Sequence, residues 1–311
     1  SSPRMLLAHI SDPHIGPLPS PKLRELMGKR FTGYVNWRRG RAAIHDMPLL
    51  DRIIADLEAQ KADHIALTGD ITNIGLAAEF PVARAFLERL GAPDYVSFVP
   101  GNHDAYVRGA LKALIRTIAP WMLSDGAKEG AMPSFPYVRR RGGVALVGLS
   151  SAVPTLPFVA SGTLGEKQLA AMGEILSELG QQGLCRIVML HHPPYYEGAK
   201  AGRQLTDSDA FQAIIAKAGA EMILHGHNHR TSLVRIRGPL KPVPVLGAPS
   251  CSAVRGLFTH RAGYHLIDIT EDGQNSRFTI RTRGVDAPRV RARALDVETA
   301  TIAQIGEMVV D

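Results

Sequence analysis

The sequence is poor in cysteine, because Cys185 and Cys251 are the only two among 311 residues. Two thiols are too few for a disulfide framework and are typical of a reducing compartment, so we expect a cytoplasmic location. No uninterrupted apolar run approaches the roughly 20 residues that a membrane-spanning helix needs. A Walker-type, glycine-rich phosphate loop is also missing, which argues against a nucleoside triphosphatase.

Acidic residues are fewer than basic ones, 29 against 36, which leaves a formal net charge of +7. This excess favours anionic partners, phosphate esters among them. The basic residues form no long stripe beyond residues 29–41 and 283–293, so a nucleic-acid partner is not indicated. Apolar residues make up 45% of the chain, which is the usual share for a globular protein.

Five short clusters of Asp, His or Asn stand out, and each directly follows an apolar run. They are Asp12-Pro13-His14, Gly69-Asp70, Gly101-Asn102-His103-Asp104, His191-His192-Pro193-Pro194 and His225-Gly226-His227-Asn228-His229. The preceding runs, MLLAHIS, HIALT, YVSFVP, RIVML and EMIL, have the length of buried strands. Strands of an α/β sheet deliver the residues that follow them to one edge, where such proteins place their sites. We therefore expect the five clusters to meet at one edge of a sheet.

The spacing of apolar residues predicts an α/β protein. In the first half, strands and helices alternate, which is typical of a partly parallel sheet with helical crossovers. The expected elements there are 4–11, 42–60, 63–69, 77–90, 95–99 and 105–123. In the second half we expect helices at 165–180 and 207–219, and strands at 136–141, 143–150, 185–190, 221–225, 230–236, 243–248, 263–270 and 275–282.

The economical architecture is one domain of two facing sheets with helices outside. We expect this domain to cover residues 4–285 and an extension to cover 286–311. Residues 296–309 in the extension have the pattern of an amphipathic helix, which would pack on the core or on a partner subunit. The sequence therefore leaves open whether the protein forms a homo-oligomer.

The clusters supply side chains of the kind that bind metal ions. In an extended backbone, residues i and i+2 point to the same side, so Asp12 and His14 can converge on one ion. Among His225, His227 and His229, any two could serve in the same way. The full set of candidate ligands is Asp12, His14, Asp70, Asn102, His191, His227 and His229. Mixed carboxylate and imidazole ligands suit Mn²⁺, Fe or Zn²⁺ better than Ca²⁺, which prefers oxygen ligands.

Taken singly, each cluster has an ordinary explanation. A histidine after a strand is usually a surface residue, and an isolated Gly-Asp is usually only a turn. Five such clusters at the ends of five predicted strands are not explained in that way. We therefore interpret them together as a site for two metal ions.

In chain order the clusters read D-x-H, G-D, G-N-H-D, H-x-P and G-H-x-H. This ordered set, over about residues 5–270, resembles the calcineurin-like metallophosphoesterase family. Its spacing is most similar to the branch of class III cyclic nucleotide phosphodiesterases and glycerophosphodiesterases. The resemblance implies a four-layer α/β/β/α sandwich of two mixed sheets, with two divalent metal ions at the strand ends.

The resemblance also implies a role for each residue. The ligands would form two groups, namely Asp12, His14 and His229 for one ion, and Asn102, His191 and His227 for the other. Asp70 would bridge the ions, while His192 and His225 would lie behind the ligands. His103 would protonate the leaving group or stabilise its charge, and Asp104 would orient His103.

Such a site implies a phosphoric diester hydrolase. Two cations about 3.5–4 Å apart neutralise the phosphoryl oxygens and lower the pKa of a bridging water, whose hydroxide can attack phosphorus. The expected substrates are small phosphodiesters, such as cyclic nucleotides or glycerophosphodiesters. The alternatives are a pyrophosphatase for a lipid-linked nucleotide, a nuclease and a non-catalytic metal-binding scaffold. His103 counts against the pyrophosphatase, because that branch commonly has Arg there, and the complete ligand set counts against the scaffold.

A basic and aromatic insert, residues 29–41, follows the first cluster. Its Phe31, Tyr34 and Trp37 lie among basic residues, so it could grip a phosphate while stacking on a base, or contact an anionic membrane surface. The alternative is a solvated loop with an aromatic anchor. Residues 195–204 follow the double histidine and either form another wall of the cleft or are a plain flexible loop.

Overall fold

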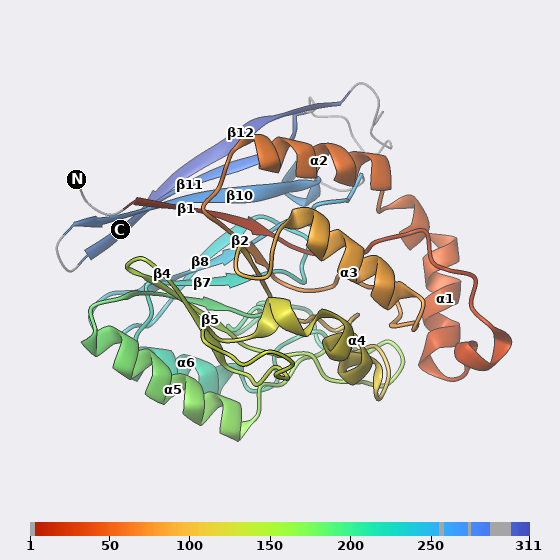
Figure 1. Cartoon of the computed structure of the whole chain (residues 1–311), viewed down its shortest axis with the longest axis horizontal. Coiled ribbons are helices and arrows are strands. Elements are labelled where there is room, and N and C mark those ends of the chain that lie inside the picture. Colours follow the sequence, from red (N-terminus) through yellow and green to blue (C-terminus); the bar gives the residue numbers. More distant parts are fainter. Residues whose placement is uncertain (1–3, 255–257, 273–274, 287–299) are drawn as a thin grey trace.

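The computed structural model describes residues 4–254, 258–272, 275–286 and 300–311 (Figure 1). Within these residues two six-stranded sheets face each other, and helices cover their outer sides. This arrangement confirms the predicted α/β/β/α sandwich of two mixed sheets.

The first sheet carries the N-terminal strands in its parallel half. Its strand order is β12-β11-β10-β1-β2-β3, and β1, β2 and β3 run parallel. The strands are β1 (Arg4–Ile10), β2 (His64–Leu67), β3 (Val96–Phe98), β10 (Gly263–Asp272), β11 (Asn275–Asp286) and β12 (Thr301–Val310). Helices α2 (Met47–Ala59) and α3 (Glu79–Leu90) pack on its outer face (Figure 1).

The second sheet has a parallel centre and antiparallel edges. Its order is β4-β5-β6-β7-β9-β8, with β5, β6, β7 and β9 parallel. The strands are β4 (Tyr137–Arg141), β5 (Val144–Gly148), β6 (Cys185–Met189), β7 (Met222–His225), β8 (Ser232–Ile236) and β9 (Val243–Gly247). Helices α5 (Glu166–Gln181) and α6 (Ser208–Ala218) cover this sheet (Figure 1).

Local sequence signals set the ends of these helices. At the start of α2, the Asp46 carboxylate accepts a hydrogen bond of 2.8 Å from the backbone N–H of Leu49, and Pro48 lies in the first turn. Gly91, the glycine expected to end a helix, is the C-cap of α3. Both helices bury an apolar face against the first sheet.

Side chains that cross between the two sheets join them. The hydroxyl of Tyr137 on β4 donates a hydrogen bond of 2.7 Å to the carbonyl of Phe98 on β3. Arg139 on the same strand donates to the carbonyl of Val96 at 2.8 Å. Cys185 and Cys251 are both buried in this core, where a free cysteine packs as a small apolar residue.

The predicted C-terminal helix is wrong, because Thr301–Val310 is the edge strand β12. It pairs antiparallel with β11, from Asp286 opposite Thr301 to Phe278 opposite Val310. Residues 296–299 of the predicted helix lie outside the described residues. The edge of β11 offers unpaired backbone groups, and pairing with it buries Val310, which outweighs a helical spacing of apolar residues. The division of the chain after residue 285 stays a prediction.

The insert at 29–41 is also not a loop. Lys29–Arg39 forms helix α1, and Arg41–Ala43 forms a short 3-10 turn, η2. The helix expected at 42–60 therefore begins only at Met47. The helix expected at 105–123 consists of α4 (Ala110–Ile118) and the 3-10 turn η3 (Ala119–Met122). In the part of the chain that the structure describes, no helix is both long and apolar enough to cross a bilayer.

Candidate active site

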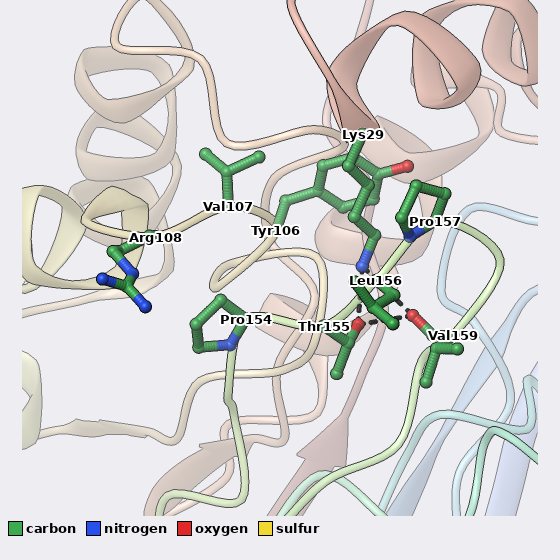
Figure 2. A pocket seen from close by; sticks show the side chains of 9 residues that line it. All are labelled: Lys29, Tyr106, Val107, Arg108, Pro154, Thr155, Leu156, Pro157 and Val159. Carbon is green, nitrogen blue, oxygen red and sulfur yellow. Dashed lines mark hydrogen bonds between the residues drawn. The ribbon is translucent and has the colours of Figure 1, made fainter.

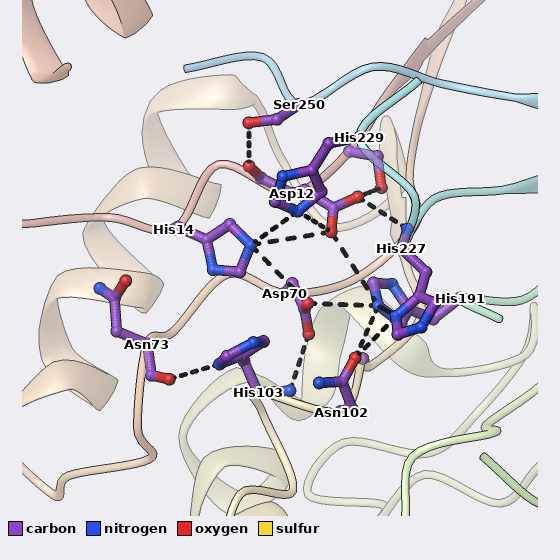
Figure 3. A network of polar contacts seen from close by, with 12 residues as sticks. Asp12, His14, Asp70, Asn73, Asn102, His103, His191, His227, His229 and Ser250 are labelled. Atoms are coloured by element: carbon purple, nitrogen blue, oxygen red, sulfur yellow. Dashed lines mark hydrogen bonds and ion pairs between the residues drawn. The ribbon is translucent and has the colours of Figure 1, made fainter. Parts of the chain in front are cut away.

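The five clusters meet between the two sheets (Figure 3). The first three follow the ends of β1, β2 and β3 in the first sheet, and the last two follow β6 and β7 in the second. The expectation that one sheet edge carries all five is therefore wrong. Neighbouring edges of two facing sheets build the site together.

Tight turns, and not the extended backbone that we expected, orient the candidate ligands. Asp12, His14, Asp70, His227 and His229 all have positive φ, between 41° and 70°. Non-glycine residues rarely adopt this left-handed conformation, which tends to occur at functional sites. Asp12 and His14 converge on one group of ligand atoms as predicted, but through these turns. His227 and His229 do not converge on one position, because they belong to two different groups of possible metal ligands.

The glycines of the clusters leave room for the ligands. A Cβ atom on Gly101 would lie 2.3 Å from Oδ1 of Asp70, and one on Gly226 would lie 2.4 Å from Oδ2 of Asp12. Both distances are far below van der Waals contact. No side chain fits at either position without displacing a candidate ligand.

One group of candidate ligands surrounds His14. Its Nε2 lies 3.1 Å from Nε2 of His229 and 3.8 Å from Oδ1 of Asp12. His229 Nε2 also lies 3.1 Å from the same carboxylate oxygen. Together with Asp70, these residues place their ligand atoms within 4.8 Å of one another.

A second group surrounds His191. Its Nε2 lies 3.1 Å from Oδ1 of Asn102, 3.3 Å from Nδ1 of His227 and 3.2 Å from Oδ2 of Asp70. His227 Nδ1 lies 3.0 Å from the same amide oxygen of Asn102. Asp70 therefore belongs to both groups, since its Oδ2 is also 3.7 Å from Nε2 of His14 (Figure 3).

The tautomers of two histidines fit a metal site. His14 Nδ1 lies 3.3 Å from the carbonyl of Thr72, and His191 Nδ1 lies 2.6 Å from the carbonyl of Thr68. A carbonyl only accepts, so Nδ1 carries a proton in both rings, and Nε2 is the nitrogen that each ring can offer to a metal ion. Both Nε2 atoms point into the cluster, where they face other ring nitrogens and carboxylate oxygens. A cation stabilises such a cluster of acceptor atoms, so the residues present fit divalent metal ions.

The charges of the site also favour a cation. Burial lowers the pKa of His14 and of His227 well below the usual value for histidine. Burial acts in the same direction on His191, but the carboxylates of Asp70 and Asp12 outweigh it and raise its pKa to about 10. The field that would hold a proton there attracts a divalent ion in the same way.

His103 and Asp104 do not make the contact that we expected. The Asp104 carboxylate accepts hydrogen bonds from the backbone N–H groups of Asp70, Thr72 and Gly101, at 2.8 to 3.0 Å. It therefore orders the backbone of two ligand turns and does not orient the His103 ring. Burial and the charge of Asp70 raise its pKa to about 7.

The carbonyl of Asn73 orients His103 instead. It lies 2.5 Å from Nδ1 of the ring, which must therefore donate the proton. Burial, followed by the charge of Arg41, lowers the pKa of His103 to about 3. The ring is therefore neutral, with its lone pair on Nε2.

The remaining histidines of the clusters lie behind the ligands, as expected. His192 has both ring nitrogens engaged, Nδ1 with Ser151 Oγ at 2.7 Å and Nε2 with the Ala160 carbonyl at 3.0 Å. His225 is buried, and its Nδ1 lies 2.9 Å from the carbonyl of Gly226. Neither residue belongs to a group of possible metal ligands among the described residues.

His45 also lies at the site, although no sequence pattern indicated it. Its ring lies 4.5 Å from that of His14 and 5.5 Å from that of His229, centroid to centroid, and the three form another possible metal-binding group. His45 follows η2 and not a strand, so no strand-end pattern marks it. Its Nδ1 lies 2.7 Å from Ser252 Oγ.

A cleft of about 680 Å³ opens onto the ligands, and residues 197–203 line it with the exception of Gly202. Of the two alternatives left open for residues 195–204, the structure therefore supports the wall of the cleft for this part. Arg41 lies on the cleft, at the end of the insert.

Two of the three aromatic residues of the insert are packed rather than free to stack on a base. Tyr34 and Trp37 stack on each other at 6.3 Å and pack against a buried cluster that includes Tyr106, while Phe31 stays exposed. Helix α1 is further held by Lys29, whose Nζ donates to Thr155 Oγ1 at 2.7 Å beside a second pocket (Figure 2). Burial lowers the pKa of Lys29 to about 8.

Comparison with known proteins agrees with this geometry. The chain is similar to the glycerophosphodiester phosphodiesterase GpdQ of Enterobacter lignolyticus, with 25% identity over 244 residues. The matched region covers 75% of this chain and 74% of that protein. The chain is 24% identical over 229 residues to a probable cyclic nucleotide phosphodiesterase of Synechococcus sp., over 73% of this chain and 79% of that protein. A solved dimetal phosphatase from Danio rerio has the same fold, with a TM-score of 0.59 and 12% identity over 90% of this chain and 96% of that one.

The fold, the clustered His and Asp residues and these relatives define a phosphoesterase of the hydrolase class. The chain belongs to the calcineurin-like phosphoesterase family, whose model matches residues 5–231. This family uses divalent metal ions, and the clusters around Asp70 are suited to bind them.

Proposed function

We propose that this protein is a dinuclear metal-dependent phosphodiesterase that hydrolyses small phosphodiesters. The observation that carries the proposal is the place of Asp70, whose carboxylate belongs to two groups of possible metal ligands at once. A carboxylate shared in this way supports a pair of ions with one bridging ligand. Relatives named as a glycerophosphodiester phosphodiesterase and a probable cyclic nucleotide phosphodiesterase support these two substrate types.

The geometry supports the following division of the ligands. One ion would be held by Asp12, His14 and His229, the other by Asn102, His191 and His227, and Asp70 would bridge them. Two divalent cations, of Mn, Fe or Zn, would neutralise the phosphoryl oxygens and activate water as the nucleophile. The thiol of Cys251 has no part in this, because it is buried and burial raises its pKa.

His103 is the residue that we propose to assist the leaving group. Its ring lies edge-on to His14, with centroids 4.9 Å apart, and its Nε2 has no hydrogen-bond partner among the described residues. Since the ring is neutral, any proton that it gives to the leaving oxygen must be taken up together with the substrate. Asp104 supports it indirectly, by fixing the turn from which His103 projects.

The decisive test compares bis(p-nitrophenyl) phosphate with p-nitrophenyl phosphate as substrates of the Mn²⁺-loaded protein. We expect a preference for the diester that is lost in Asn102→Ala and kept in Asn36→Ala, a matched change on the exposed side of α1. Preference for the monoester would contradict the proposal and indicate a phosphatase.

A second measurement tests whether His103 assists the leaving group. p-Nitrophenolate leaves without protonation, whereas an alkoxide does not. His103→Gln should therefore slow hydrolysis of glycerophosphocholine by about a hundredfold and that of bis(p-nitrophenyl) phosphate far less. Equal losses on both substrates would exclude assistance to the leaving group.

Two alternatives lead to different outcomes. A pyrophosphatase for a lipid-linked nucleotide would hydrolyse a nucleoside diphosphate diester and neither nitrophenyl ester. A non-catalytic scaffold would bind metal and hydrolyse none of them. Cytoplasmic location, membrane contact through residues 29–41 and self-association stay predictions.

A further inference from the structure

Arg41 lies on the active-site cleft, and no acceptor in the described residues takes its guanidinium hydrogens. Its Nη1 is 3.1 Å from Nδ1 of His103. That Nδ1 must carry its own proton, because it lies 2.5 Å from the carbonyl of Asn73, which only accepts. Two N–H groups therefore face each other, and the contact is not a hydrogen bond.

A partly buried guanidinium without an acceptor or an ion pair raises the free energy of the folded protein. Arg41 has no ion pair among the described residues, although an arginine keeps its charge throughout the physiological pH range. Burial lowers the pKa of Arg41, the nearby Tyr106 and Asp70 raise it in part, and the charge of Arg203 lowers it again. A charge held partly out of water without a partner is unfavourable until an anion binds.

The chain fixes Arg41 in position through helix α1. Gly33 lies directly on Tyr106, since a Cβ atom on Gly33 would be 2.2 Å from the tyrosine hydroxyl. Tyr106 stacks in turn on His103, with ring centroids 5.5 Å apart. Lys29 fastens the other end of the helix to Thr155, as Figure 2 shows. The backbone segment that leads to Arg41 is thus held by packed elements and is not a loose loop.

The cleft has more positive charge than a simple phosphodiester needs. Besides Arg41, the lining includes Lys200, Arg203 and Arg230, and Glu197 is the one acid among the described lining residues outside the ligand clusters. A phosphodiester linkage carries a single negative charge, which two divalent cations would already neutralise. The arginines are therefore available to a different anionic group.

We propose that Arg41, with Arg203 beside it, binds a second phosphate group of the substrate, so that the preferred substrates are phosphodiesters whose esterified alcohol carries a further phosphate. This inference rests on the proposed phosphodiesterase activity and specifies its substrate class. Guanidinium groups suit this role because their planar N–H donors match phosphate oxygens in pairs.

A pair of substrates that differ only in this group tests the inference. Thymidine 5′-(p-nitrophenyl phosphate) has one phosphate, and its 3′-phosphorylated form has a second, while both release p-nitrophenolate. We expect the Mn²⁺-loaded protein to have a kcat/KM about tenfold or more higher for the 3′-phosphorylated form, as one charge-assisted contact provides. Equal values would overturn the inference and leave the phosphodiesterase activity standing.

Variants assign the preference to Arg41. Arg41→Gln should bring the ratio of the two kcat/KM values close to one, Arg41→Lys should keep part of it, and Arg39→Gln, the same charge change at an exposed position of α1, should leave it unchanged. The ratio is independent of how much active protein each variant gives. An equal loss on both substrates in Arg41→Gln would mean that Arg41 binds the scissile phosphate, which also overturns the inference.

Discussion

The hydroxyl of Ser11 donates a hydrogen bond of 2.6 Å to Oδ2 of Asp12, while Oδ1 of the same carboxylate faces His229. Ser11 in turn accepts from Thr68 Oγ1 at 2.8 Å, and Nε2 of His9 lies 2.9 Å from that oxygen. Ser11 Oγ also lies 3.1 Å from the carbonyl of Thr68, and Oδ2 of Asp12 also accepts from the backbone N–H of His227 at 3.1 Å. These hydrogen bonds fix one carboxylate oxygen of Asp12 and leave the other to the metal-binding cluster.

Ser11→Ala should therefore weaken metal binding without removing a ligand. Loss of a hydrogen bond to a ligating carboxylate typically costs about 10–100-fold in metal affinity or activity. Titration of the metal-free protein with Mn²⁺ would measure the change, with Ser177→Ala on the surface of α5 as the control. An unchanged affinity for Mn²⁺ in Ser11→Ala would show that this hydrogen bond does not hold the Asp12 carboxylate in position.

Asp70→Asn should impair both halves of the cluster, because its carboxylate contacts His14 and His191. An amide has no charge with which to bridge two cations, so we expect bound metal to fall below two ions per chain and activity to fall by about a hundredfold or more. Elemental analysis and diester hydrolysis measure the two quantities. Asp51→Asn at the surface should change neither, and two tightly bound ions in Asp70→Asn would contradict the bridging role.

His64 should make the stability of the protein depend on pH. Burial, followed by the charges of Arg141 and Arg139, lowers its pKa to about 3, whereas an unfolded histidine titrates near 6.5. The unfolded chain therefore takes up the proton first, and this residue's contribution to the free energy of unfolding is lost as the pH falls from about 6.5 toward 3.

Urea unfolding at pH 7 and pH 5 measures this effect. Between these values the protein should lose about 2 kcal/mol more than His64→Gln does, because the variant has no group that titrates at this position. Glutamine can still hydrogen-bond to Ser97, whose hydroxyl lies 2.7 Å from the His64 ring in the native protein. Equal losses in both proteins would show that His64 is not held neutral.

Arg139→Leu should destabilise the fold by about 2–4 kcal/mol, because it leaves several buried carbonyls without a donor. The guanidinium of Arg139 donates to the carbonyls of Leu123, Val96 and Pro120 at 2.8, 2.8 and 2.9 Å. Arg140→Leu, one residue further on β4 and exposed, should cost about 0.5 kcal/mol or less. Thermal unfolding of both variants gives the comparison, and equal midpoints would exclude this role.

The sequence was sufficient to predict which residues gather at the site, because strand ends determine where polar clusters meet. It did not predict how they converge, since nothing in the letters D-P-H or H-N-H marks the left-handed φ of Asp12, His14 and His229. Nor did it predict Arg41 and His45, which reach the site from the connection between α1 and α2. Such residues follow no strand, and tertiary contacts place them there. Helix α1 packs on Tyr106, and His45 pairs with Ala253 and contacts Ser252.

The two errors in secondary structure have different causes. Helix α1 contains Gly33 at its centre and little amphipathic pattern, so the sequence favoured a loop, but the glycine is what allows close contact with Tyr106. In β12, apolar residues at helical spacing suggested a helix, and the unpaired edge of β11 imposed a strand. In both cases a tertiary contact overrode the local preference.

Both groups of candidate ligands draw on both sheets, with Asp12 and His14 opposite His229 in one, and Asn102 opposite His191 and His227 in the other. Bound ions would thus cross-link the two sheets of the sandwich. The sheets could not separate while the ions stay bound, so the lifetime of the closed core could not be shorter than the residence time of the metal. The rate of metal release to a chelating dye would then set an upper limit on the rate at which the two halves separate.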